Sequence, residues 1–420
     1  MRLLVPAPIL SRRAALRGLS VSFAAAFTPG PSSAAGARDP RVVVIILRGA
    51  LDGLTAVAPI GDPDYALLHG ALALPAVGEH AGLPLDGFFA LNPAMPVFAR
   101  LYKEKRALVA HAVATNYRDR SHFDGQDVLE SGYPGPNRTD SGWLNRAIAL
   151  LPAAVGAPTR GLGVGVTAPL VMRGPAPVLG WAPQGLPNAG DALAMRALDL
   201  YAHRDPALGA ALQAGLDTEK MATEGGMSEE AKKNKGGMDS PGGMRQAAAG
   251  AARLLAAPEG PRVAALAFDG WDTHQNEGAG TGQLANRLSG LDGAFEEFEK
   301  GLGERWKDTT IVAITEFGRT ARINGTNGSD HGTGTVAFLA GGAVAGGRVV
   351  ASWPGLKANQ LYQGRDLAPT TDLRALLKGV LADQLGISAQ ALGEKVFPES
   401  AGVAPMRGLV ACVIDFDGGF

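Results

Sequence analysis

Short, continuous apolar stretches recur along the chain and predict buried strands. They are residues 41–47 (RVVVIIL), 107–114 (ALVAHAVA), 262–268 (RVAALAF), 309–315 (TTIVAIT) and 336–340 (VAFLA). Strands that are apolar on both faces are typical of a parallel sheet covered by helices on each side.

The segments between these stretches carry apolar residues at helical spacing and therefore predict helices. The predicted helices span residues 92–106, 121–132, 144–151, 191–216, 246–257, 282–301 and 372–385. Residues 161–166 and 168–172 predict short strands. The alternation of strands and helices predicts an α/β fold with a mostly parallel central sheet.

One internal segment, residues 215–243, is polar and glycine-rich and has few residues that could form a core. This composition predicts a flexible insertion at about 215–245. Met221, Met227, Met238 and Met244 lie in or beside it. A soft-metal site on these methionines is the alternative interpretation.

The N-terminus has the pattern of an export signal. Arg12 and Arg13 form a twin-arginine pair, an apolar stretch follows at 19–27, and small residues at 35–37 offer a cleavage site. This pattern predicts a Tat signal peptide over residues 1–37 and a periplasmic or secreted product, with 38–420 as a single domain. The apolar stretch is shorter than the roughly 20 residues that cross a bilayer. An amphipathic first helix is the alternative.

The charge balance argues against a nucleic-acid surface, which would require a basic patch. The chain has 39 basic and 40 acidic residues, and four arginines but no acids lie within residues 1–37. The remainder therefore carries 35 basic and 40 acidic residues. Cys412 is the single cysteine, so no intramolecular disulfide can form, and we expect it to be a buried apolar residue.

Acidic residues and histidines follow the predicted strands or precede the last one. In an open α/β sheet, the carboxyl ends of parallel strands share one edge, where ligands bind. Carboxylates and imidazoles gathered there suit a divalent cation. The predicted metal ligands are Asp52, Asp272, His274, Glu316 and His331, with Asp269 and Asp330 nearby. Taken alone, a strand-end carboxylate is often a turn residue, a helix cap or an ion-pair partner, and Arg319 could play that part for Glu316.

A second group of polar residues stands where a loop enters the helix predicted at 121–132. Ser121 is placed as the helix N-cap, and Arg118 and Arg120 precede it. A helix start and two guanidinium groups suit a phosphoryl or sulfuryl group, which an activated serine could attack. The alternative is a plain cap with solvated arginines. His122 is open to three roles: a ligand, an acid–base group or a packed side chain.

The other histidines, His69, His80, His111 and His203, have no acidic or histidine companions at suggestive spacing. His111 lies within a predicted strand, and we expect it to be structural.

Several of these segments occur together in an order that resembles a known family. RGALDGL, NYRDRSHFDGQDVLESG, FDGWDTHQNE, TEFGRT and DHGTG follow the twin-arginine start over about residues 41–398. The series resembles a large bacterial domain-of-unknown-function family, number fifteen hundred and one, of Tat-exported proteins. That family looks like a branch of the alkaline phosphatase-like superfamily, which includes phosphatases, sulfatases and cofactor-independent phosphoglycerate mutases. The resemblance implies a three-layer sandwich.

The resemblance also implies roles for individual residues. Asp52 matches the first metal-binding aspartate, Ser121 the nucleophile, and Asp272 with His274 a ligand pair. Glu316 stands where the superfamily has a strand-end aspartate, and His331 resembles the late histidine ligand. The superfamily follows that aspartate with a histidine, whereas this chain has Phe317, which cannot bind a metal. Together with the short spacing from Asp272 to His274, this implies one zinc, manganese or calcium ion rather than two.

The function predicted from these patterns is an exported metal-dependent hydrolase of phosphate or sulfate esters, with Ser121, Arg118, Arg120 and His122 as catalytic residues. Its partners would be a small-molecule or polymeric ester and the Tat machinery, with no nucleic acid and no stable membrane span. The alternative is a non-catalytic, metal-depleted scaffold that binds a periplasmic partner or an anionic polymer, as Phe317 suggests. A third hypothesis is metal delivery by the methionine-rich insertion.

Overall fold

The computed structural model describes residues 38–152, 161–183, 191–224 and 237–411. The chain divides into two compact units, Met1–Asp39 and Pro40–Phe420, and only the second is described below. The predicted Tat signal and Cys412 lie outside the described residues. Among the described helices, none has the length and apolar character needed to span a bilayer.

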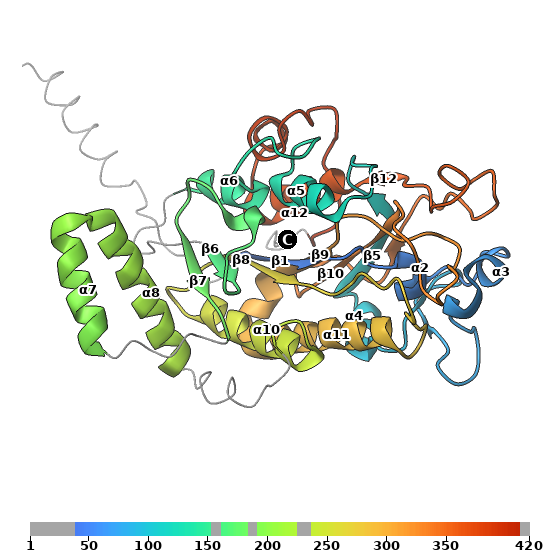
Figure 1. Cartoon of the computed structure of the whole chain (residues 1–420), viewed down its shortest axis with the longest axis horizontal. Helices are drawn as coiled ribbons and strands as arrows, with labels where there is room; N and C mark the ends of the chain where they lie inside the picture. Colours follow the sequence, from blue (N-terminus) through green and yellow to red (C-terminus); the bar gives the residue numbers. More distant parts are fainter. Residues whose placement is uncertain (1–37, 153–160, 184–190, 225–236, 412–420) are drawn as a thin grey trace, which may run out of the picture. The chain divides into compact units, whose positions relative to one another are not determined.

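A nine-stranded sheet forms the centre of the described structure (Figure 1). The strand order is β11-β5-β10-β9-β1-β8-β6-β7, and β12 pairs with β5. The strands are β1 (Arg41–Leu47), β5 (Ala107–Ala114), β6 (Gly161–Val164), β7 (Val178–Trp181), β8 (Val263–Phe268), β9 (Thr309–Ile314), β10 (Thr335–Ala340), β11 (Val349–Val350) and β12 (Thr371–Asp372). The predicted mostly parallel sheet is confirmed.

Strand β10 is antiparallel to both of its neighbours, β5 and β9. β1 is parallel to β8 and β9, and β6 is parallel to β7 and β8. The amino end of β10 therefore lies at the same edge of the sheet as the carboxyl ends of β1, β5, β8 and β9. This direction brings the loop before β10 to the edge where the other candidate residues lie.

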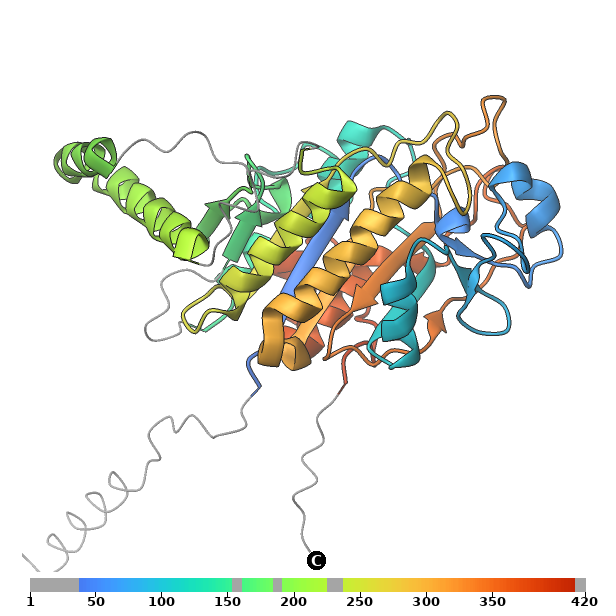
Figure 2. The same cartoon turned by 90° about the horizontal axis from the view of Figure 1, so that it is seen from below.

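Helices cover both faces of the sheet, which confirms the predicted α/β sandwich (Figures 1 and 2). Alternate residues of β1 enter different cores: Val43, Ile45 and Leu47 join one, while Val44 and Ile46 join the other. This is the two-residue periodicity of a strand that is buried on both sides. The first core is completed by α4 (Pro96–Lys103), α10 (Pro241–Ala256) and α11 (Gln283–Leu302). The second is completed by α5 (His122–Ser131), α6 (Trp143–Ala149) and α12 (Leu373–Leu385).

Smaller elements surround this sandwich. A three-stranded sheet contains β2 (Val57–Ala58), β4 (Ala90–Leu91) and β3 (Leu83–Pro84), in that order. The remaining helices are α2 (Gly53–Ala56), α3 (Tyr65–His69), α7 (Asp191–Arg204), α8 (Pro206–Glu224) and α13 (Ala389–Ala391). Single helical turns are η1 (Gly70–Leu72), η2 (Leu170–Met172), η3 (Gly303–Asp308) and η4 (Leu392–Val396).

Two local predictions were wrong. The segment predicted as a strand at 168–172 contains the 3-10 turn η2, whereas β7 was not predicted at all. The helix predicted at 191–216 is two helices, α7 and α8, because Pro206 lacks the N–H that would continue α7.

The predicted insertion is helical at both of its ends. Residues 215–224 belong to α8, residues 225–236 lie outside the described residues, and α10 starts at Pro241 rather than at Gln246. Ser240 caps α10 by accepting a hydrogen bond at Oγ from the N–H of Gly243 (3.0 Å). Met244 is fully buried in the first core, so packing accounts for this methionine.

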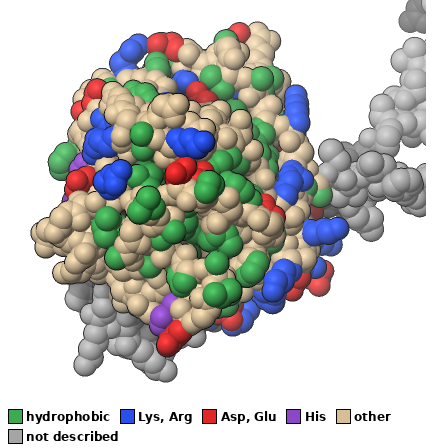
Figure 3. Space-filling model, turned by 90° about the vertical axis from the view of Figure 1, so that its right-hand side faces the viewer, with side chains coloured by type: hydrophobic (Ala, Val, Ile, Leu, Met, Phe, Trp, Pro, Cys, Tyr) green, Lys and Arg blue, Asp and Glu red, His purple; other side chains and the backbone are tan. Residues whose placement is uncertain are grey.

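The face of the molecule on the α3 side carries apolar side chains, with acidic and basic ones interspersed around them (Figure 3). Leu67 of α3 and Val77 after η1 are 88% and 83% exposed. Scattered exposed apolar residues are normal on protein surfaces, so these two residues need no functional explanation.

A pH-dependent contact connects α11 to the start of α4. Asp292 accepts hydrogen bonds from the N–H groups of Val97 (3.0 Å) and Phe98 (2.8 Å). Burial raises the pKa of Asp292 to about 6, whereas an aspartate in an unfolded chain has a pKa near ~3.9. The folded protein therefore binds more protons than the unfolded chain between these two values. The contribution of Asp292 to the free energy of unfolding is complete at pH values below the pKa of the unfolded chain and is lost as the pH rises through about 6.

We expect Asp292→Asn to flatten this part of the pH profile, because asparagine does not titrate. Urea denaturation of both proteins at a series of pH values between about 4 and 7 measures the difference. Asp205→Asn, in the exposed turn between α7 and α8, is the control. Equal pH slopes in the wild type and Asp292→Asn would contradict the assignment.

Candidate metal centre

Four loops meet at the carboxyl edge of the parallel strands. They follow β1, β5, β8 and β9, and the last of them is also the loop that precedes β10, which runs in the opposite direction. The loops after β1 and β8 approach each other closely: a Cβ at Gly49 would lie 2.5 Å from the backbone nitrogen of Asp272. Gly49 also has a φ of +120°, which side-chain-bearing residues rarely adopt. Glycine at this position therefore permits the contact between the loops after β1 and β8.

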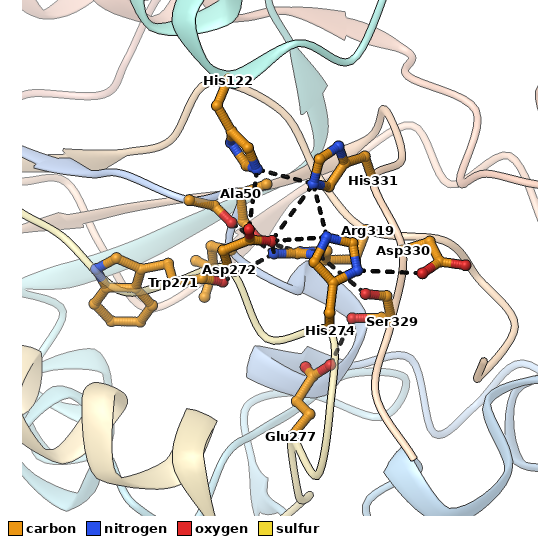
Figure 4. Close-up of polar contacts among 12 residues, drawn as sticks. Ala50, His122, Trp271, Asp272, His274, Glu277, Arg319, Ser329, Asp330 and His331 are labelled. Carbon is orange, nitrogen blue, oxygen red and sulfur yellow. Dashed lines mark hydrogen bonds and ion pairs between the residues drawn. The ribbon is translucent and has the colours of Figure 1, made fainter. Parts of the chain in front are cut away.

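Three histidines from three of these loops bring their Nε2 atoms together (Figure 4). His331 Nε2 lies 2.9 Å from His122 Nε2 and 2.9 Å from His274 Nε2. The carboxylate of Asp272 lies beside them, 3.1 Å from His274 Nε2, 3.4 Å from His331 Nε2 and 3.5 Å from His122 Nε2. These four side chains, His122, Asp272, His274 and His331, are called the histidine cluster below.

The other ring nitrogen of each histidine contacts an acceptor. His122 Nδ1 lies 2.8 Å from Glu316 Oε1, and His274 Nδ1 lies 3.2 Å from Asp330 Oδ1. His331 Nδ1 lies 3.0 Å from the carbonyl oxygen of Arg120. A carbonyl or carboxylate oxygen requires a donor, so each Nδ1 carries the proton when the ring is neutral. All three Nε2 lone pairs then point into the cluster.

Three lone pairs at this distance repel one another unless a cation lies between them. Imidazole nitrogens held by acceptors on their far side, together with a carboxylate, are the usual ligands of a divalent transition metal. Ligands about 2.0–2.2 Å from one tetrahedral ion lie about 3.3 Å apart. The five observed contacts among these side chains, of 2.9 to 3.5 Å, bracket that value. His122, Asp272 and His331 lie close enough to one another to hold one metal ion, and His274 adjoins them.

Buried Arg319 holds Asp272 in this position. Its guanidinium donates to the Asp272 carboxylate. The same guanidinium donates to the carbonyl oxygens of Gly49 (2.7 Å), Ala50 (2.8 Å), Trp271 (3.3 Å) and Ser329 (3.0 Å). Arg319 thus connects the loops after β1 and β8 to the loop before β10. Burial alone would raise the pKa of Asp272, but the hydrogen bond and charge of Arg319 outweigh it and lower that pKa.

Glu316 lies behind His122 rather than among the converging Nε2 atoms. It is fully buried, and Oε1 accepts hydrogen bonds from the N–H of Gly49 (2.8 Å) and from Gln126 Nε2 (3.2 Å) in addition to its contact with His122. Burial raises the pKa of Glu316, but the bonds from His122 and the backbone outweigh it, so the net pKa is lowered. An ionised Glu316 orients the imidazole of His122.

The pKa of His331 is also lowered, first by burial and then by the charges of His122 and Arg319. A lowered histidine pKa keeps the ring neutral near pH 7, and only a neutral ring has a lone pair for a metal.

Phe317 packs against the cluster. Its ring stacks on His122, with centroids 5.0 Å apart, and lies 5.5 Å from the ring of His331. Phe317 is buried with Ala50, Tyr117 and Val128. An apolar ring at this place cannot contribute a ligand, in agreement with a site for one ion.

The predicted metal ligands separate into two groups. Asp272, His274 and His331 come together, and His122, predicted as a catalytic residue, joins them as a candidate ligand. Asp52 has other partners: it caps α2 and contacts Thr55 Oγ1 (2.8 Å) and His69 Nε2 (3.2 Å).

His69 was expected to lack an acidic companion, and that expectation was wrong. Burial raises the pKa of Asp52, but the charge of His69 outweighs it and lowers that pKa, while the charge of Asp52 raises the pKa of His69 against burial. Burial and the charge of Asp52 raise the pKa of Glu277. Glu277 accepts a hydrogen bond from Ser329, the residue whose carbonyl receives Arg319. Asp52, His69 and Glu277 thus form a buried network that reaches Arg319 through Ser329.

Of the predicted catalytic group, Ser121 is the N-cap residue of α5, but its side chain makes no capping hydrogen bond. Arg118 Nη1 donates to the carbonyl oxygens of Thr115 and Tyr117. Arg120 donates to Asp366 Oδ2 (2.7 Å) and Gln363 Oε1 (2.8 Å). Both guanidinium groups therefore have partners in the protein.

Sequence reasoning named Arg319 only as a possible partner of Glu316, whereas it binds Asp272. It missed Glu277 and the role of the Arg120 carbonyl. The position of Arg319 in TEFGRT could have indicated a role at the site, because it lies three residues after Glu316, which was a predicted ligand. The Arg120 carbonyl gave no such indication, because backbone direction is not visible in a side-chain pattern. Arg120 has a φ of +60°, which turns the backbone before Ser121.

A family model described as "Protein of unknown function (DUF1501)" matches residues 96–396. The resemblance to this family is thereby confirmed. A comparison with curated proteins finds no match.

Three solved structures share low similarity with the chain. Ps i-CgsB in complex with k-i-k-neocarrahexaose has 12% sequence identity and a TM-score of 0.41, and the match covers 87% of this chain and 77% of that one. The C-terminal periplasmic domain of EcEptC from Escherichia coli in complex with Zn has 10% identity and a TM-score of 0.33, with 73% and 74% covered. The phosphonate monoester hydrolase of Agrobacterium radiobacter has 12% identity and a TM-score of 0.31, with 87% and 78% covered.

The role of Arg319 can be tested with Arg319→Lys. The lysine keeps the positive charge, but it has too few N–H donors to bind all the oxygen atoms that Arg319 binds. We expect the free energy of unfolding to fall by about 3 kcal/mol or more, because each buried carbonyl left without a donor costs about 1–3 kcal/mol. Urea denaturation measures this change. Arg322→Lys, at an exposed position three residues later, is the control. Equal stability of the two variants would show that Arg319 does not hold the loops together.

Proposed function

The chain belongs to the DUF1501 family, and we propose that it is a metal-dependent hydrolase of phosphate or sulfate esters that uses one divalent ion. The convergence of three histidine Nε2 atoms on the carboxylate of Asp272 carries this proposal. Zinc or manganese suits these ligands better than calcium, which prefers oxygen ligands. We further propose that the protein is exported through the Tat pathway and acts in the periplasm or outside the cell.

His122, His274, His331 and Asp272 would hold the ion, which when bound would act as a Lewis acid on the ester. Glu316, Asp330 and the carbonyl of Arg120 would keep each imidazole in the tautomer that exposes Nε2. Their removal would weaken the site even though none of them faces its centre.

Ser121 is the proposed nucleophile. It directly precedes His122 at the start of the ten-residue helix α5, and its hydroxyl makes no capping bond to that helix. The serine oxygen would form a new P–O or S–O bond as the alcohol leaves, and water would then cleave the new bond. The serine proton passes to solvent, and the departing alkoxide takes up a proton. The first N–H groups of α5 would face the anionic group.

Arg365 is better placed than Arg118 or Arg120 to bind the non-bridging oxygens of the ester. Its Nη2 donates to the carbonyl oxygen of His331 (2.6 Å), and its Nε lies 3.7 Å from Asp366. Its side chain is 42% exposed, which leaves N–H groups at the rim of the cluster.

The alternative of a metal-depleted scaffold rested on Phe317. The structure favours the metal-dependent proposal over it, because Phe317 stacks on His122 while the three histidines and Asp272 remain together. A scaffold with no metal would gain nothing from three opposed lone pairs.

Metal content is the direct test of the proposal. We expect the purified protein to hold about one zinc or manganese ion per chain by inductively coupled plasma mass spectrometry, since the described residues contain one such donor set. His331→Ala removes the nitrogen that contacts both other imidazoles and should lower the content at least about tenfold. His80→Ala, at an exposed histidine, is the control and should keep the ion. A metal-free wild-type protein that takes up neither ion on dialysis would overturn the proposal.

The nucleophile is tested with Ser121→Ala. We expect kcat for 4-nitrophenyl phosphate or 4-nitrophenyl sulfate to fall by about 10³-fold or more, with unchanged metal content. Ser388→Ala is the control, because Ser388 likewise stands at the N-cap position of a helix, α13, although its side chain, unlike that of Ser121, makes the capping bond. Full activity of Ser121→Ala would show that water, and not this serine, attacks the ester.

A further inference from the structure

A second polar site lies at the same edge of the sheet as the histidine cluster. α10 leads into β8 and α11 leads into β9, so both helices run antiparallel to these strands and start at this edge. They lie side by side (Figures 1 and 2). Their first turns border a solvent-open cavity of about 380 Å³, lined by Asp239, Ser240, Pro241, Gln283, Asn286 and Arg287.

A short stretch of chain connects this cavity to the histidine cluster. The N–H of Asp269 donates to Asp239 Oδ1 (2.7 Å), and Asp272 follows three residues later. Three extended residues span at most about 11 Å. Arg287 covers this stretch, since a Cβ at Gly270 would lie 2.4 Å from its Nη2. One substrate molecule can therefore reach both places.

The lining selects a class of ligand. Five of the six lining residues carry polar side chains, which offer hydrogen bonds to a polar ligand. An anion would meet the carboxylate of Asp239 together with nearby Asp269, whose pKa is raised by burial and by the charge of Asp239. Hydroxyl groups both donate and accept, so they match a lining of carboxylate, amide, hydroxyl and guanidinium groups.

Part of this lining is held in place before any ligand binds. Arg287 donates to the carbonyl oxygen of Asp239, and Ser240 Oγ is bound to the N–H of Gly243. Gln283 Nε2 donates to the carbonyl oxygen of Gln275 (2.8 Å). Prior positioning lowers the entropy cost of binding a small polar ligand.

We propose that this cavity binds the polyhydroxylated part of the substrate, so that the natural substrate is a phosphate or sulfate ester of a saccharide or polyol. The inference rests on the proposed hydrolase function for the ester group but identifies a separate site for the alcohol part. The ester lies at the histidine cluster, and the hydroxyl groups of the same molecule contact Asp239, Asn286 and Arg287.

An exposed residue on α11 serves for the test. Asn286→Ala removes an amide from the lining and leaves the bond from Gln283 to the loop of His274 in place. With glucose 6-phosphate or glucose 6-sulfate as substrate, we expect kcat/KM to fall at least about tenfold, mainly through KM, because lost binding energy lowers kcat/KM. With the corresponding 4-nitrophenyl ester, which has no hydroxyl groups, kcat/KM should stay within about twofold. Lys300→Ala, near the other end of α11, should change neither value. Equal losses on both substrates, or no loss on either, would overturn the inference.

A binding measurement separates this inference from the proposed hydrolysis. Saturation-transfer NMR with a mixture of glucose, galactose and mannose requires no turnover and no metal. We expect transfer to at least one of these neutral sugars in the wild type and its loss in Asn286→Ala. No transfer to any of the three would overturn the inference even if ester hydrolysis were observed. Transfer without hydrolysis would support the sugar site and count against the hydrolase.

Discussion

The arrangement of the candidate centre depends on one buried guanidinium. A charge removed from water costs several kcal/mol unless each of its donors finds a partner. Arg319 meets this condition with four backbone carbonyls and the carboxylate of Asp272. The carbonyls belong to three loops that follow or precede different strands. The same bonds that satisfy the guanidinium therefore fix the loops relative to one another and aim Asp272 at the three histidines.

Hydrogen bonds behind the histidines complete the arrangement. Glu316, Asp330 and the carbonyl of Arg120 each occupy one Nδ1, which leaves the three Nε2 atoms to face one another. A protein core normally avoids opposed acceptors at 2.9 Å, because their lone pairs repel. A bound cation converts this repulsion into attraction. Phe317 stacks on His122 beside the cluster, and the carboxylate of Glu316 contacts Nδ1 of the same histidine.

The regular core was predictable because its signal is local. The apolar runs of β1, β5, β8 and β9 mark buried strands, and the carboxyl-edge rule placed Asp272, His274 and His331 together before the structure was known. The same rule misplaced Asp52, since a carboxylate after a strand serves equally well as a helix cap. Its partner His69 comes from a separate helix, and no spacing in the sequence indicates that contact. The direction of β10 was also not visible, although it determines where His331 lies. The contact between His331 and the backbone carbonyl of Arg120 could not be predicted from the pattern of side chains.

The most direct test of this account is the location of a bound ion in crystals of the metal-loaded protein, from anomalous scattering measured at the absorption edge of zinc or manganese. The account predicts one strong peak per chain, enclosed by Nε2 of His122, His274 and His331 and the carboxylate of Asp272. A peak beside Asp52 and Glu277, or no peak at the three histidines, would contradict it.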